Sequence, residues 1–294
     1  MKVYTAFNFF NELDMLELRL EVMNSAVDYF VICESTKTHS GKPKPLYYQE
    51  NKRRYSKFKN KIIHYVIKDT PQTYNDLENL EPEDSIHNSV INNVKNMEWV
   101  PKNEMHFVRD GYEKECQKRG IALGHPKGDD IMVVGDLDEI PRPGMLKGLV
   151  EIFDNERIYL LENMSCSFYA NLEKAGETWM GASVLTFEKL LQNSIPSLRM
   201  FKTGNHVING GWHFTYMGGA EEIVKKLEAF SHQEFNTEYI KANVPYLLAN
   251  CVQNGIDILG RPSQWIVHDI NDGTLPEYLV NNKDKFKKYI YYAN

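Results

Sequence analysis

The chain has 294 residues, of which 42% are hydrophobic and 25% charged, with 34 Lys and Arg against 40 Asp and Glu. This composition is typical of a globular protein with a large core, and it excludes collagen, coiled coils and disordered linkers. The net charge of −6 argues against a duplex nucleic-acid binder, and no apolar run approaches the roughly 20 residues of a membrane span.

The first 67 residues alternate between strand-like and helical patterns. Residues 2–7 and 28–33 predict strands, and apolar residues at helical spacing predict a helix between them. A polar loop over residues 34–46 and a basic, helical stretch over residues 52–59 precede a third strand-like segment, residues 61–67. This alternation is typical of a parallel sheet covered by helices.

The pattern breaks over residues 70–103, which are rich in Asn and Glu, contain three prolines and show little apolar periodicity. We expect an irregular, mobile insertion there. A helix over residues 107–123 and a strand over residues 129–135 follow. The strand contains the fully apolar run Ile131–Val134, as a central parallel strand does.

The second half of the chain predicts a mixture of strands, helices and loops. We expect a helix near residues 144–153, strands near 157–169 and 179–187, a loop rich in Gly and Asn before Gly211, and a helix opening at 218–222. From about Asn236 onward the sequence predicts short helices and loops. Together with the first half, this is an α/β chain.

The four cysteines are widely scattered and form no CxxC motif. This usage fits a reducing compartment, and the N-terminus shows no signal-peptide pattern, so we expect a cytoplasmic protein.

The sharpest local feature is Asp136-Leu137-Asp138, directly after the Ile131–Val134 run. In open α/β sheets, ligands bind outside the carboxyl ends of the strands, and two carboxylates there are able to hold a hard divalent cation between the phosphates of a nucleotide. The alternative is that these residues cap a turn and the following helix. Position alone leaves both interpretations open.

Residues in the second half offer further chemistry, each with a structural alternative. His213, within Gly211-Trp212-His213-Phe214, is either a hydrogen-bonded core histidine or a ligand that completes a Mn²⁺ site. Glu221 and Glu222 follow Gly218-Gly219 at a helix start. They are either favourable partners of the helix dipole or a general base on the cleft.

Polar residues also follow the second predicted strand. They are candidates to hold a nucleoside, although strand-to-loop transitions are polar in general: Glu34, Thr38, Ser40 and Gly41. Arg109 and Arg199 are candidate phosphate partners, since a guanidinium forks onto phosphate oxygens. Dinucleotide-binding, P-loop, HExxH and GxSxG motifs are absent from the sequence, which argues against dehydrogenases, P-loop kinases, zinc metalloproteases and α/β-hydrolases.

Together these motifs resemble glycosyltransferase family 17, the β-1,4-mannosyl-glycoprotein 4-β-N-acetylglucosaminyltransferase family. Four groups of residues carry the resemblance, in family order: 11–20 with 27–35 and 38–43, then 109–119, then Gly135–Pro141, then Gly211–Phe214. They leave residues 70–103 and much of the C-terminus unmatched. Unlike the animal members, this sequence begins without a membrane anchor, which predicts a cytosolic bacterial or viral enzyme.

The resemblance implies one GT-A domain over residues 1–294, with a sugar-nucleotide half (1–141) and an acceptor half (142–294). It implies a metal-dependent, inverting glycosyltransferase that uses Mn²⁺ or Mg²⁺ and moves a sugar from a nucleotide donor, UDP-N-acetylglucosamine, to a glycan hydroxyl. Asp136 and Asp138 match the metal and diphosphate motif, and His213 matches the family's histidine.

The resemblance also suggests roles for residues outside the DxD motif. Arg199 matches an upstream arginine, and Glu221 matches an acidic position expected to supply the base. Glu222 is the reserve for that role. Two other functions stay open: a nucleotidyltransferase acting on a sugar phosphate, and an inactive glycan-binding protein.

Overall fold

The structure, a computed structural model, describes residues 1–292. Its strands are β1 (Val3–Asn8), β2 (Tyr29–Ser35), β3 (Ile62–Ile67), β4 (Ile131–Asp136), β5 (Glu139–Pro141), β6 (Tyr159–Ser167), β7 (Leu172–Thr186), β8 (Asn205–Thr215) and β9 (Trp265–Val267). They form one mixed sheet in the order β3-β2-β1-β4-β7-β6-β8-β5, with β9 paired to β7. Strands from both halves of the sequence therefore join a single sheet.

The first four strands in the sheet order are parallel, as the sequence predicts. The direction changes at β4, whose other neighbour β7 is antiparallel to it. Beyond β7 the sheet continues through β6 and β8, which are parallel to each other. The sequence patterns therefore identified the parallel half, but the predicted loop before Gly211 is wrong, because Asn205–Gly210 lies in β8 beside β6.

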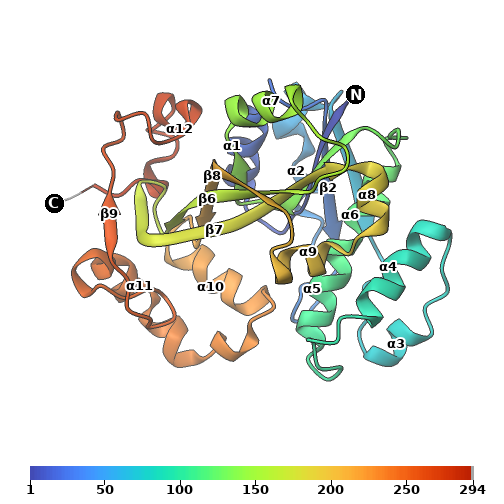
Figure 1. Ribbon diagram of the computed structural model, residues 1–294. Coiled ribbons are helices and arrows are strands. Elements are labelled where there is room, and N and C mark those ends of the chain that lie inside the picture. The colour runs from blue at the N-terminus through green and yellow to red at the C-terminus, as the bar shows by residue number, and fades with distance from the viewer. Residues whose placement is uncertain (293–294) are drawn as a thin grey trace.

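Helices cover both faces of the sheet. They are α1 (Leu13–Met23), α2 (Tyr47–Asn51), α3 (Tyr74–Glu78), α4 (Ser85–Lys95), α5 (Met105–Glu115), α6 (Gln117–Ala122), α7 (Pro143–Glu151), α8 (Phe187–Gln192), α9 (Ile195–Phe201), α10 (Ala220–Ala229), α11 (Glu238–Asn254) and α12 (Glu277–Asn281). In Figure 1, α1 and α7 lie on one side of the sheet, and α5 and α9 lie on the other. Basic residues 52–58 form a 3₁₀ helix, close to the helical stretch predicted there.

Alternating side chains of the central strands supply one hydrophobic core on each face. Phe30 and Ile32 of β2 belong to the core under α1, whereas Val31 and Cys33 belong to the core under α5 and α6. This alternation follows from the two-residue period of a strand. All four cysteines are buried and unpaired within the described residues, so they act as small apolar side chains.

The prediction of an irregular insertion over residues 70–103 is wrong. Thr73 and Asp76 form a reciprocal capping box at the start of α3, and Asp84 caps α4 by accepting a hydrogen bond from the backbone N–H of His87. Val90, Ile91 and Val94 of α4 are buried against the core under α5. The apolar stripe is real, but the asparagines around it hide it from a count of apolar residues.

The C-terminal part also differs from the prediction of short helices and loops. The helix α11 has 17 residues, although Pro245 lies inside it and Asn250 departs from helical geometry. Its buried Val244 and Cys251 pack with Ile223 and Leu227 of α10 in a third hydrophobic cluster. The pairing with α10 therefore supplies stability that α11 lacks on its own, because most helical stability comes from packing of an apolar face.

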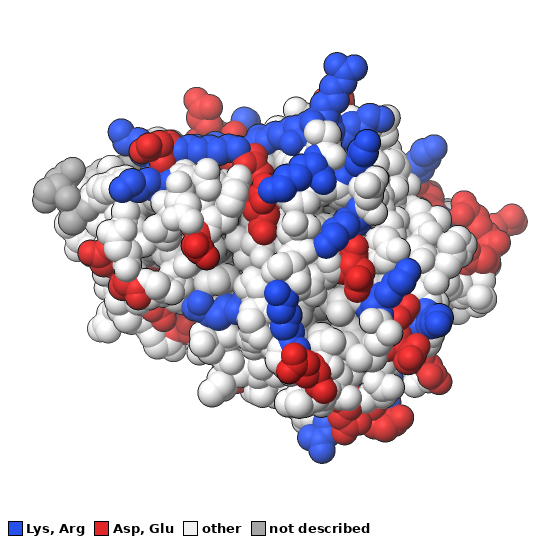
Figure 2. All heavy atoms as spheres, turned by 90° about the horizontal axis from the view of Figure 1, so that it is seen from above, with Lys and Arg blue, Asp and Glu red and all other residues white. Residues whose placement is uncertain are grey.

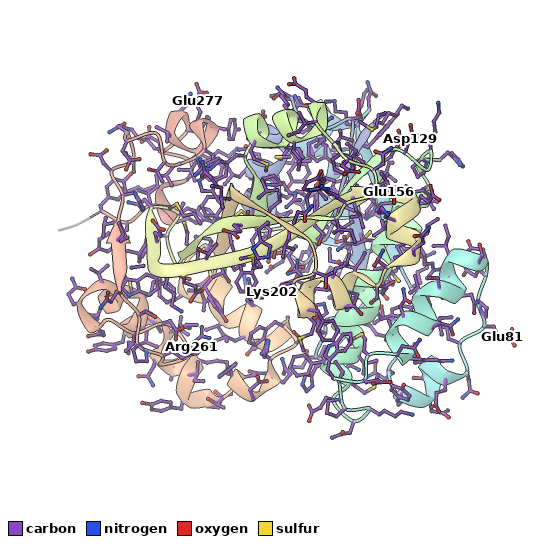
Figure 3. All side chains as sticks on the ribbon, viewed as in Figure 1. Glu81, Asp129, Glu156, Lys202, Arg261 and Glu277 are labelled. Carbon is purple, nitrogen blue, oxygen red and sulfur yellow. The ribbon has the colours of Figure 1, made fainter. Side chains whose placement is uncertain are left out.

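Charged side chains are spread over the surface. On the face in Figure 2, Asp and Glu are interspersed among Lys and Arg. The six charged residues labelled in Figure 3, from Glu81 to Glu277, are all exposed and come from widely separated parts of the sequence. Within residues 1–292, no helix is long and apolar enough to cross a membrane.

The helical structure of residues 70–103 predicts a stability effect. Replacing Ile91 by Ala removes a buried side chain from the core and should lower the free energy of unfolding by about 2–5 kcal/mol. Asn92→Ala, at the exposed neighbouring position of the same helix, should change it by less than about 0.5 kcal/mol. Urea unfolding of both variants measures the difference. Equal, small effects would show that α4 does not pack on the core.

Candidate functional site

The candidate site lies at the carboxyl ends of β1 and β4, in the middle of the sheet. The two strands are parallel neighbours, and Asn8 pairs with Asp136 at their last shared position. A cavity of about 650 Å³ opens beyond these ends. Ligands of open α/β sheets bind in such a position, so Asp136 and Asp138 lie where the sequence predicted.

One buried arginine holds the turn that carries both aspartates. Arg19 of α1 is fully buried, and its guanidinium donates hydrogen bonds to the backbone carbonyls of Asp136, Leu137 and Glu139 at 2.8, 3.0 and 2.7 Å. It also donates to Thr5 Oγ1 at 2.8 Å. Burial lowers the pKa of Arg19 to about 10, so the group stays charged at neutral pH. These hydrogen bonds from α1 hold the backbone of the turn in place.

Arg19 was missed by the sequence reasoning, although the sequence carries a signal for it. It lies three residues after Leu16 and four before Met23, and so on the apolar stripe of α1. A charged residue at such a position is expected to be buried with partners, since an isolated buried charge is strongly unfavourable.

Asp136 is oriented by an ion-pair network that reaches across the sheet. Arg199 Nη2 of α9 lies 2.6 Å from Asp136 Oδ2 and 2.8 Å from Oε1 of the fully buried Glu139. Trp179 Nε1 donates to Glu139 Oε1 at 2.7 Å, and the Asp136 N–H donates to Glu139 Oε2 at 2.9 Å. Burial opposes the charge on Asp136, but Arg199 together with the other nearby cations, Lys114 and Lys226 among them, outweighs burial and lowers the pKa of this carboxyl. Arg199 was predicted to bind the donor; here it positions Asp136.

Asp138 faces two groups from the second half of the chain. Its Oδ2 lies 3.2 Å from Lys226 Nζ of α10, and its Oδ1 lies 3.8 Å from His213 Nε2 of β8. The backbone N–H of Phe214 donates to the Asp138 carbonyl at 2.9 Å, which ties the turn to β8. The structure therefore brings Asp138 and His213 together, and it adds Lys226, which the sequence did not indicate.

His213 is held as a neutral ring. It stacks on Trp179 with the ring centroids 4.1 Å apart, and it is almost fully buried. Burial lowers the pKa of His213 despite the nearby acidic residues. Its Nδ1 is buried and finds no hydrogen-bond partner within residues 1–292. A neutral imidazole keeps one lone pair available for a metal.

The donor set fits a borderline divalent cation such as Mn²⁺, because carboxylate oxygen and imidazole nitrogen are both acceptable to it. Of the three predicted ligands, Asp138 and His213 face each other, whereas Asp136 Oδ2 forms an ion pair with Arg199.

Across residues 1–292, the one trio of His and carboxylate donors within 4.8 Å of each other lies elsewhere, at Asp69, Glu83 and His87. Arg119 already pairs with both carboxylates of that trio, at 2.6 Å from Asp69 and 3.0 Å from Glu83. Arg119 therefore compensates the negative charge of Asp69 and Glu83 without a metal ion.

The predicted nucleoside loop lies beside the cavity, but only part of it faces the cavity. Thr38 is among the lining residues, whereas Arg109 does not line the cavity and instead contacts the backbone of the loop. Arg109 Nε donates to the His39 carbonyl at 2.6 Å, and Nη1 donates to the Gln72 carbonyl at 3.1 Å. Gly41, at φ +89°, allows this approach, since a Cβ there would lie 3.1 Å from the guanidinium carbon.

Glu34 is likewise a supporting residue in the structure. It is fully buried, accepts a hydrogen bond from the Tyr48 N–H at 2.9 Å and lies 3.1 Å from His64 Nε2. Lys44 Nζ, 3.9 Å from Glu34 Oε1, belongs to the cavity lining. Glu34 therefore reaches the cavity through Lys44, not directly. Ser40 contributes its backbone N–H, which donates to the Ala229 carbonyl of α10 at 3.2 Å.

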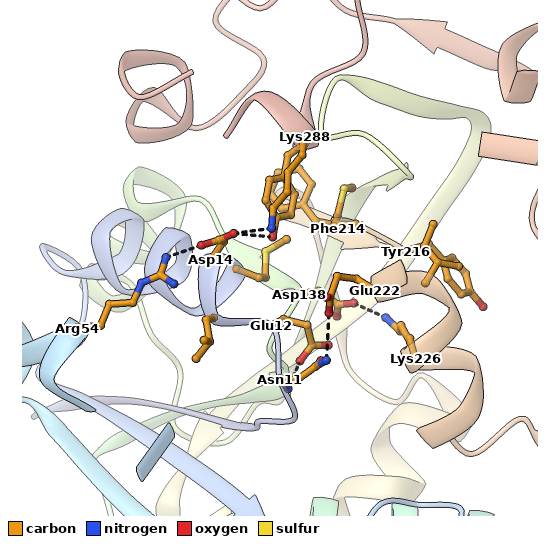
Figure 4. A pocket seen from close by; sticks show the side chains of 15 residues that line it. Asn11, Glu12, Asp14, Arg54, Asp138, Phe214, Tyr216, Glu222, Lys226 and Lys288 are labelled. Atoms are coloured by element: carbon orange, nitrogen blue, oxygen red, sulfur yellow. Dashed lines mark hydrogen bonds and ion pairs between the residues drawn. The ribbon is translucent and has the colours of Figure 1, made fainter. Parts of the chain in front are cut away.

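A second, smaller cavity of about 190 Å³ is also lined by Asp138 (Figure 4). Both cavities share Glu12, Asp138, Tyr216 and Lys226 in their walls. The small cavity also contains Glu222, whose Oε2 accepts a hydrogen bond from Asn11 Nδ2 at 3.1 Å.

The two candidate bases are placed differently. Glu222 faces the small cavity, whereas Glu221 is exposed on α10 and lines neither cavity. One residue along a helix turns the side chain by about 100°, which accounts for the difference.

The structure is thus an α/β protein with two adjoining cavities, both lined by Asp138, at the carboxyl ends of parallel strands. The model of glycosyltransferase family 17 matches residues 1–113. The chain is similar to the enzymes named β-1,4-mannosyl-glycoprotein 4-β-N-acetylglucosaminyltransferase from Rattus norvegicus and Mus musculus, each 21% identical over 319 residues, and to that from Homo sapiens, also 21% identical.

These matches cover 97% of this chain and 54% of each relative, so the chain spans about half the length of the curated relatives it matches. The resemblance to glycosyltransferase family 17 is therefore confirmed, and glycosyl transfer is the class of reaction that it supports. Asp136, Asp138 and His213 lie outside the residues that the family model matches.

The loop beside the cavity predicts a pH dependence of stability. His39 Nε2 lies 3.3 Å from Glu113 and Nδ1 lies 3.5 Å from Asp110. Burial opposes protonation of His39, but the charges of Glu113 and Asp110 outweigh it and raise the pKa of His39 above its usual 6.5. A raised pKa stabilises the fold fully below the unfolded-state pKa, and the contribution is lost as pH rises through the folded-state pKa.

His39→Asn should therefore lower the free energy of unfolding by up to about 1 kcal/mol at pH 5.5, and by less at pH 8.5. Urea unfolding at both pH values measures this. His125→Asn, at an exposed position, controls for the removal of a histidine. A loss of stability that is the same at both pH values would contradict the ion pairing of His39.

Proposed function

We propose that the protein is a metal-dependent, inverting glycosyltransferase that moves N-acetylglucosamine from UDP-N-acetylglucosamine to a glycan hydroxyl. The observation that carries this proposal is the position of Asp138, which lies in the wall shared by two cavities of different size. Transfer between two sugars needs a donor and an acceptor chamber that meet at the reacting centre. The names of the similar enzymes support the choice of sugar.

The larger cavity is the proposed donor chamber. Its volume of about 650 Å³ falls in the usual range for small-molecule sites. Cationic Lys37, Lys44 and Lys114 and the aromatic Phe10 and Phe107 are among its lining residues. Lysines attract the diphosphate, and aromatic rings offer apolar faces to a base or a sugar.

Asp138 and His213 would hold Mn²⁺, or Mg²⁺, and Asp136 would contact the metal or the ribose of the donor. The cation supplies positive charge that stabilises the leaving diphosphate. Arg199 keeps Asp136 ionised and oriented, and the stack on Trp179 keeps the His213 ring in place. These residues are fixed before the ligand arrives, which limits reorganisation during the reaction.

The smaller cavity is the proposed acceptor chamber. Phe214, Tyr216 and Tyr289 provide aromatic walls, and Asn11 and Glu222 provide polar groups. Glu222 takes the proton of the acceptor hydroxyl as that oxygen attacks the anomeric carbon from the side opposite the diphosphate. Attack from that side inverts the anomeric configuration.

A panel of sugar nucleotides, each with Mn²⁺, tests the donor. We expect UDP-N-acetylglucosamine to be hydrolysed or transferred with release of UDP. Release of pyrophosphate from a nucleoside triphosphate and a sugar phosphate would instead establish a nucleotidyltransferase. Binding of glycans without turnover of any donor would establish a glycan-binding protein.

Asp138→Asn should reduce Mn²⁺-dependent turnover by at least about a hundredfold, because an anionic ligand is lost where charge develops. Asp129→Asn removes a carboxylate at an exposed position near the start of β4 and should leave turnover unchanged. Steady-state assays of both variants at saturating Mn²⁺ make the comparison. Full activity of Asp138→Asn would exclude Asp138 as a metal ligand.

Adjacent glutamates on α10 provide a matched test of the base. Glu222→Gln should lower kcat by about 10²–10⁴, since general-base catalysis typically contributes that much. Glu221→Gln should stay within about threefold of wild type, because Glu221 points away from both cavities. A large fall in kcat for Glu221→Gln alone would identify Glu221 as the base. Values of kcat close to wild type in both variants would exclude both glutamates.

A further inference from the structure

Lys226 differs from the other cations of the site in how it is held. Its Nζ contacts Asp138 Oδ2 at 3.2 Å and Thr215 Oγ1 at 3.5 Å, and it lies 5.3 Å from the centre of the Tyr216 ring. In Figure 4 it reaches from α10 toward Asp138. Arg199, by contrast, is bound in a fork by the buried Glu139 and has little freedom to move.

The surroundings of Lys226 keep it charged. The carboxylates that face it are Asp138, from the turn after β4, and Glu12, at the start of α1. Burial disfavours the ammonium, but these carboxylates outweigh it and raise the pKa of Lys226. The side chain is 28% exposed, so the flexible stem has room to turn.

Asp138 thus has two alternative cationic partners. The carboxylate oxygen that Lys226 contacts belongs to the residue proposed to bind the divalent cation, and the two positive charges repel each other at this distance. A dication that binds Asp138 therefore competes with Lys226 for this carboxylate, and the repulsion between the two cations favours displacement of the lysine. The displaced ammonium lies in the wall of the donor chamber, where the strongest available acceptor is the diphosphate of the donor.

We propose that Lys226 is the counter-ion of Asp138 until metal and donor bind, and that it then transfers to the donor diphosphate. This inference rests on the proposed function. The transfer of Lys226 means that bound metal raises the affinity for the nucleotide, and bound nucleotide raises the affinity for the metal. The metal releases the lysine from Asp138, and the diphosphate then accepts its hydrogen bonds. Such coupling is reciprocal between the two ligands.

Calorimetric titrations with Mn²⁺ alone and with UDP at saturating Mn²⁺ test this in the full chain. In Lys226→Met we expect Mn²⁺ alone to bind at least about tenfold more tightly, because its competitor is gone. UDP at saturating Mn²⁺ should bind about tenfold more weakly, because a charge-assisted contact is lost. Opposite changes in the two affinities are not expected from general damage to the site.

Two further variants are the controls. Lys225→Met removes the neighbouring, more exposed lysine, which pairs with Glu222 at 2.8 Å, and should change neither affinity. Lys226→Arg keeps the charge and should stay close to wild type for Mn²⁺. If Lys226→Met fails to fold, Lys226→Gln, which also removes the charge, takes its place with the same expected changes.

Mn²⁺ binding that is equal or weaker in Lys226→Met, with Lys226→Arg and Lys225→Met like wild type, would overturn the inference. Asp138→Asn separates this failure from that of the proposed function. If Asp138→Asn weakens Mn²⁺ binding but Lys226→Met does not strengthen it, only the transfer of Lys226 is wrong. If Asp138→Asn has no effect on Mn²⁺ binding, the proposed metal position is wrong as well.

Discussion

The guanidinium of Arg19 is buried beneath the turn that carries Asp136 and Asp138, and three carbonyls of that turn accept its hydrogen bonds. The charge is taken out of water and compensated mainly by backbone dipoles, with the nearby carboxylates adding to it. Removing such a partner would take one hydrogen bond from each of these three carbonyls, which costs free energy wherever the carbonyl stays buried. The positions of Asp136 and Asp138 therefore depend on Arg19, a residue of α1 that lines neither cavity.

A second buried charge, Glu139, links this turn to the rest of the sheet. It joins Arg199 of α9 and Trp179 of β7 to the backbone of Asp136. Trp179 in turn stacks on His213, so one carboxylate orders both the acidic residue and the imidazole of the proposed metal site. Contacts of this kind, one shell outside the groups proposed to bind the metal, fix the orientation of those groups.

The sequence predicted those parts of the fold in which local pattern and final environment agree. The apolar run Ile131–Val134 is a central strand because both of its faces are buried, and the aspartates after it lie at the end of the sheet for that reason. The apolar face of α4 was missed because its few apolar residues lie among asparagines. The bends of α11 show that its packing on α10, which no local pattern reveals, maintains the helix.

The sequence placed Asp138 and His213 in one site through their motifs, but it did not reveal the contacts that surround them. Lys226 follows Asp138 by 88 residues, and their contact depends on where α10 lies relative to the turn after β4. Arg109 looked like a phosphate ligand because of its type, but its direction is set by the carbonyl of His39. Glu221 and Glu222 have the same chemistry, and only the rotation of α10 distinguishes them.

The hydrogen bond from the Ser40 N–H to the Ala229 carbonyl joins the loop beside the donor chamber to the last turn of α10. The same helix carries Lys226 in its last turn and Glu222 in its first turn. A ten-residue helix is a rod about 15 Å long. One rigid element therefore carries the attachment point of the loop, the lysine beside Asp138 and the glutamate of the smaller cavity, so the positions of all three are set together.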